Sequence, residues 1–344
     1  MKYEVTLGIP VYNVEKYIRL TMDSALAQTF ESIEFIVLDD CGTDDSIAIV
    51  REYQETHPRG KDIRIVRQPQ NMGIGQGRNR IIDEAQGRYL YFMDADDEIT
   101  PRAIELLYDN AQRYHAQIVY GSFEKIVVTG NTVTRTPLVY PSAQFLEGDD
   151  WPNYVYRCYD GIQAMTWNLL IDIGVFRQNG LRFKPIQYWE DFMLTMDLPA
   201  YITRAVLLPD VTYRYYCREG SLSHFGKRSH IDKAEVVETI EALAQVKAQS
   251  DRLRRKPYFV QRTYKVMETC YFVVCTVFRH QHIISPPFTK CEIRDIMRSP
   301  LSLREILSFR HLRWRHLTLY LFSVLPPSVS VALMKASAKE RRLA

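Results

Sequence analysis

The 344-residue sequence lacks several features that would assign it to a specialised class of protein. Its cysteines form no C-x-x-C pair and have no metal-finger spacing, which favours scattered, reduced thiols in a reducing compartment. The first ten residues carry an acid and a short strand-like run, whereas a secretory signal needs a basic end and a longer apolar region. Internal repeats and low-complexity tracts are also missing. We therefore expect an ordinary cytoplasmic globular protein.

Composition excludes further classes. With 46% hydrophobic and 25% charged residues, neither extended disorder nor a multi-span membrane protein fits. The net charge of +3 conceals an asymmetry, because residues 251–344 hold 18 Lys+Arg against 6 Asp+Glu, whereas residues 1–250 hold 26 against 35. A basic tail favours contact with an anionic membrane or with nucleic acid. Nothing in the acidic residues 1–250 points to nucleic acid, so we expect no nucleic-acid partner.

The first 125 residues alternate between short β-branched runs and stretches with helical spacing of apolar residues. This pattern predicts strands at 5–10, 33–38, 63–66 and 89–93, and helices at 15–28, 43–54, 75–86 and from Pro101, which we place in the first turn of its helix. Such alternation builds a mostly parallel sheet with helices on both faces. Later strands are expected at 132–139 and 206–216, and long helices at about 230–255 and 258–280. The predicted class is α/β, followed by a helical C-terminal region.

Carboxylates follow two of the predicted strands. Asp39 and Asp40 end the second strand, and Asp94 and Asp96 follow the fourth. In parallel sheets, ligands bind outside the carboxyl ends of the strands. Alternation along an extended chain points Asp94 and Asp96 the same way, and two converging carboxylates suit Mg²⁺ or Mn²⁺. The alternative is a solvated turn in which Asp97 caps the next helix.

Two further segments carry polar chemistry. Residues 71–80 form a glycine-rich loop that enters a helix and includes Arg78, an arrangement that can present backbone N–H groups to an anion. Its glycines fall at G-x-G-x-G after the third strand, which is not the dinucleotide fingerprint. Downstream, Glu190 and Asp191 follow a tryptophan, and one of them could act as a general base. A structural turn and a simple cap of a helix from Phe192 are the alternatives.

Taken together and in order, these segments resemble the family 2 glycosyltransferases of GT-A fold. The matching residues are Ile9–Asn13, Val37–Ser46, Asn71 and Gly73, Arg78 and Asn79, Ala85–Tyr89, Phe92–Asp97, and Glu190 with Asp191. The likeness is strongest over residues 3–105 and extends more weakly to about 225. It implies a GT-A domain over 1–228, with a nucleotide-sugar half (1–105) and an acceptor half (106–228), followed by a helical region over 229–344.

The resemblance implies metal-dependent, inverting transfer of a sugar from a UDP-sugar to a saccharide or lipid-linked saccharide acceptor in cell-surface polysaccharide biosynthesis. It implies Asp191 as the catalytic base with Glu190 beside it. A Mn²⁺ or Mg²⁺ ion is implied at Asp96, with Asp94 and His224 as further candidate ligands. The implied nucleotide-sugar site comprises Pro10, Tyr12, Asp39, Asp40, Arg78, Asp94 and Arg218. Asp39 is expected to accept the N3–H of uracil.

Other classes share parts of this pattern. A nicotinamide-dependent oxidoreductase is disfavoured because the fingerprint after the first strand is missing. A nucleotidyltransferase that makes the nucleotide sugar could share the sheet, the metal and the uridine site. A non-catalytic sugar-nucleotide binder would need no acceptor-side base, so the Glu190-Asp191 pair argues against it.

The basic tail contains an uncharged stretch of 18 residues, Leu317–Met334, at the lower length limit for a membrane span and interrupted by Pro326 and Pro327. Basic residues lie on both sides of it: Arg310, Arg313 and Arg315 before, and Lys335, Lys339, Arg341 and Arg342 after. This arrangement favours a segment that lies in an anionic interface. We predict peripheral contact with the inner face of the cell membrane through residues 311–344; the alternative is a buried helix pair.

Overall fold

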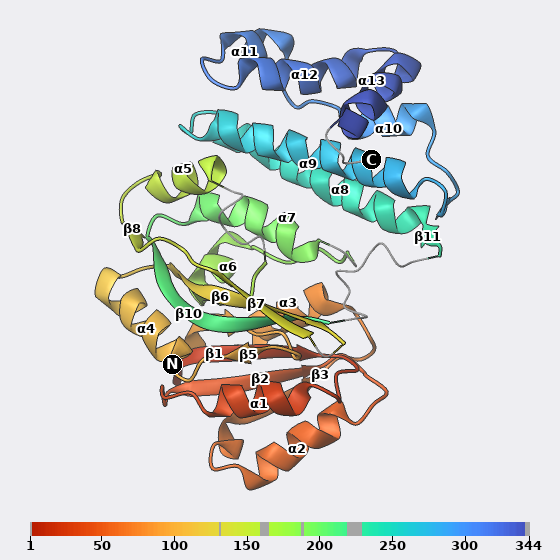
Figure 1. Ribbon diagram of the computed structural model, residues 1–344. Coiled ribbons are helices and arrows are strands. Elements are labelled where there is room, and N and C mark those ends of the chain that lie inside the picture. The colour runs from red at the N-terminus through yellow and green to blue at the C-terminus, as the bar shows by residue number, and fades with distance from the viewer. Residues whose placement is uncertain (1, 131, 159–164, 187–188, 219–228, 341–344) are drawn as a thin grey trace. The chain divides into compact units, whose positions relative to one another are not determined.

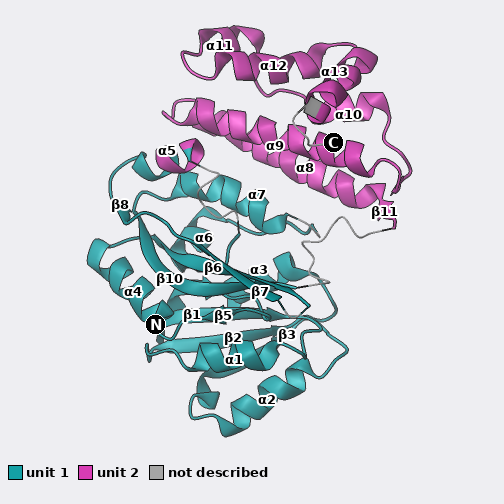
Figure 2. Cartoon of the chain, viewed as in Figure 1, with its two compact units in different colours: residues 1–152, 158–224 teal, residues 153–157, 225–344 magenta. Residues whose placement is uncertain are grey.

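The computed structural model describes residues 2–130, 132–158, 165–186, 189–218 and 229–340 and divides into two compact units (Figures 1 and 2). Unit 1 comprises residues 1–152 and 158–224, and unit 2 comprises residues 153–157 and 225–344. The predicted domain boundary at residue 228, and the division of the first domain at residue 105, stay predictions.

One ten-stranded sheet forms the centre of unit 1 (Figure 1). Its main order is β3 (Ile63–Arg67), β2 (Ile33–Asp39), β1 (Tyr3–Val11), β4 (Gly87–Phe92), β9 (Leu169–Asp172), β6 (Ile118–Thr129), β10 (Ala205–Cys217) and β5 (Glu98–Ile99). In addition, β7 (Thr132–Leu138) pairs with β6, and β8 (Ala143–Phe145) pairs with β10. The predicted parallel arrangement is found from β3 to β4, whereas β9 runs antiparallel to both β4 and β6. The sheet is therefore parallel over β1 to β4 and mixed over the strands that follow along the chain.

Helices cover both faces of the parallel part. On one face, Leu7 and Ile9 of β1 pack in a core shared with Met22 of α1 (Ile18–Leu26) and Ile104 of α4 (Ala103–Tyr114). The opposite face meets α3 (Ile74–Glu84). A Cβ atom on Gly8 would lie only 2.6 Å from the Ile81 side chain of that helix. Glycine, which has no Cβ atom, avoids this clash. Strands buried on both faces are apolar over nearly their whole length, which made them visible in the sequence.

The other helices of this part of the chain are α2 (Ser46–Thr56), α5 (Asp150–Arg157), α6 (Ile173–Asn179) and α7 (Glu190–Asp197). One local prediction is wrong: α4 begins at Ala103 with Arg102 as its N-cap residue, so Pro101 precedes the helix rather than lying in its first turn. Because β2 and β4 flank β1 on opposite sides, the carboxyl ends of these three strands border the crevice where such sheets bind ligands.

Unit 2 is helical. It contains α8 (Lys233–Gln249), α9 (Phe259–His280), α10 (Lys290–Ile296), α11 (Leu303–Ser308), α12 (Arg313–Val324) and α13 (Pro327–Glu340), with a short pairing of β11 (Ile231–Asp232) and β12 (Ile284–Ser285). The centre of this unit is α9, and most of its residues are buried. The predicted helical C-terminal region is therefore present. Among the described residues, we find no helix whose length and apolar character would let it cross a membrane.

Candidate active site

The acidic turn after β4 is anchored to β10. The backbone N–H of Asp94 donates to the Tyr213 hydroxyl at 3.1 Å, and that hydroxyl donates to Asp97 Oδ2 at 2.8 Å. Asp97 Oδ1 accepts from the backbone N–H of Tyr216 at 2.8 Å. Burial, together with the charges of Asp94 and Asp96, raises the pKa of Asp97 well above its usual range. Asp97 is thus a buried anchor of the turn, not the helix cap of the alternative interpretation.

The two carboxylates of this turn each face an arginine. Asp94 Oδ1 lies 3.0 Å from Arg78 Nη2, and Asp96 Oδ2 lies 3.2 Å from Arg218 Nη1. Both side chains keep some exposure, 24% for Asp94 and 33% for Asp96. Burial and then the Asp94 charge raise the pKa of Asp96, while Arg218 acts in the opposite direction. The turn therefore presents two crowded, accessible carboxylates.

Arg218 is fixed by aromatic rings as well as by charge. Its guanidinium lies over the rings of Tyr17, at 4.1 Å from the centroid, and Tyr216, at 4.4 Å. It also donates to the backbone carbonyl of Asp96. Cation–π contacts of this kind orient a guanidinium without neutralising it. The structure thus places Arg218 at the acidic turn, its role in nucleotide-sugar binding stays a prediction, and His224 lies outside the described residues.

Arg78 joins the acidic turn to the downstream carboxylate pair. It lies on α3 with a side chain only 2% exposed, and its Nη1 is 2.8 Å from Glu190 Oε1 while its Nη2 bonds Asp94. The rings of Phe92 and Phe183 lie 5.9 and 5.5 Å from its guanidinium carbon. One buried cation therefore contacts both Asp94 and Glu190, and Glu190 lies 112 positions from it in the chain.

Two neighbours of Arg78 position the same downstream segment. The Asn79 side chain donates to the carbonyl of Phe183 and accepts from its N–H, both at 2.9 Å. One turn earlier, a Cβ atom on Gly75 would lie 2.9 Å from the Lys184 carbonyl oxygen and 3.2 Å from Glu190 Cγ. Glycine at this position therefore permits the close approach of α3 to the acceptor-side segment.

Glu190 and Asp191 occupy the first turn of α7, which begins at Glu190 and not at Phe192. Trp189, just before them, has a left-handed backbone with φ of 67°. Burial and the Asp191 charge raise the pKa of Glu190 to about 7, against the effect of Arg78. Burial also raises the pKa of Asp191, opposed by Arg78 and by the N–H of Phe192, which donates to Asp191 Oδ1 at 2.7 Å. Two adjacent carboxylates, Glu190 buried and Asp191 partly exposed, both with raised pKa values, are suited to accepting a proton near neutral pH.

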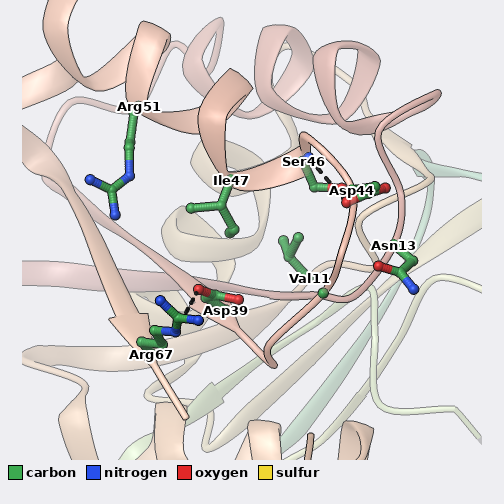
Figure 3. Close-up of a pocket in the computed structure, with 9 residues that line it drawn as sticks. Val11, Asn13, Asp39, Asp44, Ser46, Ile47, Arg51 and Arg67 are labelled. Atoms are coloured by element: carbon green, nitrogen blue, oxygen red, sulfur yellow. Dashed lines mark hydrogen bonds and ion pairs between the residues drawn. The ribbon is translucent and has the colours of Figure 1, made fainter. Parts of the chain in front are cut away.

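A pocket opens at the carboxyl ends of β1 and β2 (Figure 3). It is lined by Val11, Asn13, Asp39, Gly42, Asp44, Ser46, Ile47, Arg51 and Arg67. Asp39 Oδ1 accepts from the N–H of Cys41 at 2.9 Å, and its Oδ2 lies 3.4 Å from Arg67 Nε. Pro10 lies near the end of β1 and the half-exposed Tyr12 directly follows it. Our sequence analysis missed Arg67, although it ends β3 and the same strand-end rule that selected Asp39 could have found it.

Asp40 holds the glycine-rich loop. Its two oxygens accept from the backbone N–H groups of Met72, at 2.9 Å, and Gly73, at 3.0 Å. Burial raises the pKa of this carboxyl. Gly73 precedes α3 with φ of 81°, a conformation that favours glycine. Two amides of the loop are therefore already paired with a carboxylate, and a direct contact of Asp40 with the nucleotide stays a prediction.

Asp94 and Asp96 are the candidate ligands for a metal ion. In the parts of the chain that the structure describes, no group of three or more His, Cys, Asp or Glu side chains gathers as a metal centre. Asp94 and Asp96 nevertheless offer accessible hard oxygens on one turn. A magnesium or manganese ion bound by one or two carboxylates usually completes its shell with waters and substrate phosphates. The residues present fit a metal of that kind.

The sequence model described as "Glycosyl transferase family 2" matches residues 6–188, more than half of the chain. The protein belongs to glycosyl transferase family 2 and is a glycosyltransferase, which confirms the predicted family.

Individual relatives agree with this assignment. The chain is 26% identical over 336 residues to the uncharacterized glycosyltransferase YibD of Escherichia coli, covering 92% of this chain and 94% of that protein. It is 28% identical over 239 residues to the succinoglycan biosynthesis protein ExoO of Rhizobium meliloti, covering 67% of this chain and 65% of that one. Residues 1–349 of Staphylococcus aureus TarS, solved in complex with UDP-GlcNAc, superpose with a TM-score of 0.68 at 18% identity, covering 98% of this chain and 92% of the other. The predicted GT-A fold class is confirmed.

Proposed function

We propose that this glycosyltransferase moves a sugar from a UDP-sugar to a hydroxyl group of a saccharide or lipid-linked saccharide, with inversion at the anomeric carbon. The observation that carries the proposal is the Arg78 bridge, because it joins Asp94 of the acidic turn to Glu190 of the acceptor-side pair. The bridge brings a carboxylate of the acidic turn and the Glu190-Asp191 pair into one site, and a transferase needs its donor and its general base close together.

The donor nucleotide is assigned from the pocket at the strand ends. Asp39 lines this pocket, and a carboxylate there can accept the N3–H of uracil. Arg67 lies 3.4 Å from Asp39 Oδ2, so it would contact the base or move aside on binding. The UDP-GlcNAc complex of the similarly folded TarS supports a uridine nucleotide. We assign Pro10, Tyr12 and Asp39 to the uridine part and Asp94 to the ribose and donor sugar.

The acceptor chemistry is assigned to Asp191. Glu190 is bound to Arg78 at 2.8 Å, which suits it to a positioning role, whereas Asp191 accepts a hydrogen bond from the backbone N–H of Phe192 through Oδ1. In the proposed step, Asp191 takes the proton of the acceptor hydroxyl as its oxygen forms a bond to the anomeric carbon. The bond from that carbon to the diphosphate oxygen breaks with its electron pair. One displacement inverts the centre, so an α-linked donor gives a β-glycoside.

The leaving diphosphate needs positive charge where its own charge develops. Arg218, held over two tyrosine rings beside Asp96, is placed to supply part of it. Asp96, with Asp94 beside it, would hold a Mn²⁺ or Mg²⁺ ion, which when bound neutralises diphosphate charge. We propose a role in cell-surface polysaccharide synthesis, which the similarity to ExoO supports.

A donor screen tests this function. The protein is incubated with UDP-Glc, UDP-Gal, UDP-GlcNAc or UDP-GalNAc, with and without Mn²⁺, and the release of UDP is measured. We expect release from at least one donor, reduced in Asp39→Ala. Release of pyrophosphate in place of UDP would point to the nucleotidyltransferase alternative. If calorimetry detects no binding of UDP in either metal condition, the proposed donor class is wrong.

A further inference from the structure

The last two helices of unit 2 have one face buried and the other uncovered. On α12, His316 Nε2 lies 3.0 Å from the carbonyl oxygen of Val260, and Phe322 stacks on Tyr271 with ring centroids 5.8 Å apart. On α13, the carbonyl of Met334 accepts from the Tyr271 hydroxyl at 3.4 Å. Both helices therefore pack on α9 (Figure 1), and their opposite faces point away from it.

Those opposite faces are apolar. We define the outer face as Trp314, Leu321 and Val324 of α12 with Val329 and Leu333 of α13. Their side chains run from 43% exposed, at Leu321, to 75% exposed, at Trp314. Trp314 and Leu321 lie about two helical turns apart, so they share one side of α12. Val329 and Leu333 lie about one turn apart and likewise share a side of α13. Scattered exposed apolar residues are ordinary, but a face of this kind, with an uncovered tryptophan, marks an interaction surface.

The charges around this face have one sign. Between residues 306 and 339 the chain has no Asp or Glu, and it has Arg310, Arg313, Arg315, Lys335 and Lys339. All five are exposed, and none of them forms an ion pair with another described residue. Arg315 and Lys335 lie over aromatic rings, which leaves their charge intact. The surroundings therefore attract anions and repel a second copy of the same face.

We propose that the outer face of α12 and α13 rests on an anionic lipid bilayer, with Trp314 and Leu321 inserted at the level of the headgroups. Tryptophan, aliphatic side chains and flanking cations are the composition of helices that lie in a membrane interface. The residues of this surface belong to unit 2, whereas the acidic turn and Asp191 belong to unit 1, so the proposal goes beyond the proposed transfer reaction and does not depend on the donor.

Vesicle sedimentation of the full chain tests the proposal, with equimolar phosphatidylglycerol and phosphatidylcholine compared with phosphatidylcholine alone. We expect binding to the anionic vesicles, weakened by added salt. Leu321→Asp should weaken it at least about tenfold, because an inserted leucine is replaced by a charge. Val133→Asp is the matched control, since Val133 is a 54% exposed valine on β7 of unit 1, and it should bind like the wild type. Arg310→Ser combined with Lys339→Ser should weaken binding about thirtyfold, from about 1 kcal/mol for each cation near the surface.

Insertion has its own optical signal. Of the four tryptophans, Trp151 and Trp167 are buried, Trp189 of unit 1 is partly exposed, and Trp314 is 75% exposed on the outer face. Brominated lipids should therefore quench chiefly Trp314, and Trp314→Phe should remove most of that quenching. UDP release, measured on every variant, separates loss of membrane binding from loss of folding or of transferase activity.

The proposal is overturned if the wild type ignores anionic vesicles, or if Leu321→Asp and Val133→Asp lose binding equally. A dimer in solution that Leu321→Asp dissociates, without vesicle binding, would also overturn it and would assign the face to self-association.

Discussion

Arg78→Gln is the most informative perturbation of the site, because it removes one buried positive charge from between two carboxylates. The wild-type side chain is 2% exposed and bonds Glu190 at 2.8 Å and Asp94 at 3.0 Å. Glutamine keeps an N–H donor group, but it is shorter and loses the charge and the bidentate shape. Removing one partner of a buried ion pair typically destabilises a protein by about 3–5 kcal/mol, because the remaining charge is left uncompensated. We expect a loss of free energy of unfolding in that range at about pH 8.

The loss should shrink as the pH falls. The pKa of Glu190, about 7, already exceeds its ordinary value of 4.5, so the fold binds this proton more tightly than the unfolded chain does. Such a group supports stability below its unfolded pKa, and that support is lost as the pH rises through the folded pKa. Arg78 lowers the pKa of both Glu190 and Asp191, so its removal should raise both pKa values further. The variant should therefore be closer to the wild type at about pH 6 than at about pH 8.

Urea unfolding at the two pH values measures the change in stability, and a pH profile of the transfer rate measures the change in the pKa of the base. A carboxylate base works when it is ionised, so the acid limb of the rate profile should move to higher pH in Arg78→Gln. Arg80→Gln is the control: it lies two residues along the same helix, is 49% exposed and pairs with Glu84 at 2.7 Å. Exposed pairs of this kind contribute about 1 kcal/mol or less. If both variants lose similar stability and neither moves the acid limb, Arg78 does not couple the two carboxylate groups as we argue.

The remaining predictions concern single sub-sites. Asp191→Asn should lower the rate of acceptor transfer by about 10²–10⁴ while UDP affinity stays near that of the wild type, and Glu190→Gln should cost less; transfer kinetics beside calorimetry check this, and the reverse order would make Glu190 the base. Asp96→Asn should remove the Mn²⁺-dependent part of UDP binding, whereas Asp39→Ala should weaken UDP binding with or without Mn²⁺; equal losses in both conditions would refute this division of roles. Gly75→Ala should destabilise the protein by about 1–3 kcal/mol in urea unfolding, although alanine is normally the better helix residue, and an unchanged midpoint would show that α3 has room to move.

The nucleotide half was predictable because its signals are local. Ile33–Leu38 forms a strand buried on both faces, so its apolar run and the aspartates that end it are consecutive in the sequence. The rule for carboxyl ends of strands then placed Asp39 and Asp94 near one edge of the sheet before any coordinates were known. The order of apolar runs and aspartates along the chain was enough to predict this part of the sheet and its site.

The acceptor half was not predictable in the same way, because its contacts join distant residues. Strand β9 has four residues and lies between β4 and β6, so its place depends on neighbours that local periodicity cannot reveal. The sequence also suggested Arg78 and Glu190 separately, but their pairing spans 112 positions. Tyr213, which bonds both Asp94 and Asp97, lies in the strand predicted over 206–216, but nothing in that prediction indicated these bonds. Which distant polar groups meet is decided by how the elements pack, not by spacing.

The contact between Asn79 and Phe183 has a consequence for how this enzyme can diversify. Asn79 bonds the backbone N–H and carbonyl of residue 183 and leaves the side chain there out of the hydrogen-bonding arrangement. Any residue type except proline offers the same two backbone groups. A substitution of Phe183 would therefore keep the main chain tied to the helix that carries Arg78 and would change only the packing of the buried ring on Arg78 and Phe92. The course of the main chain here and the packing around Arg78 can thus vary independently of each other.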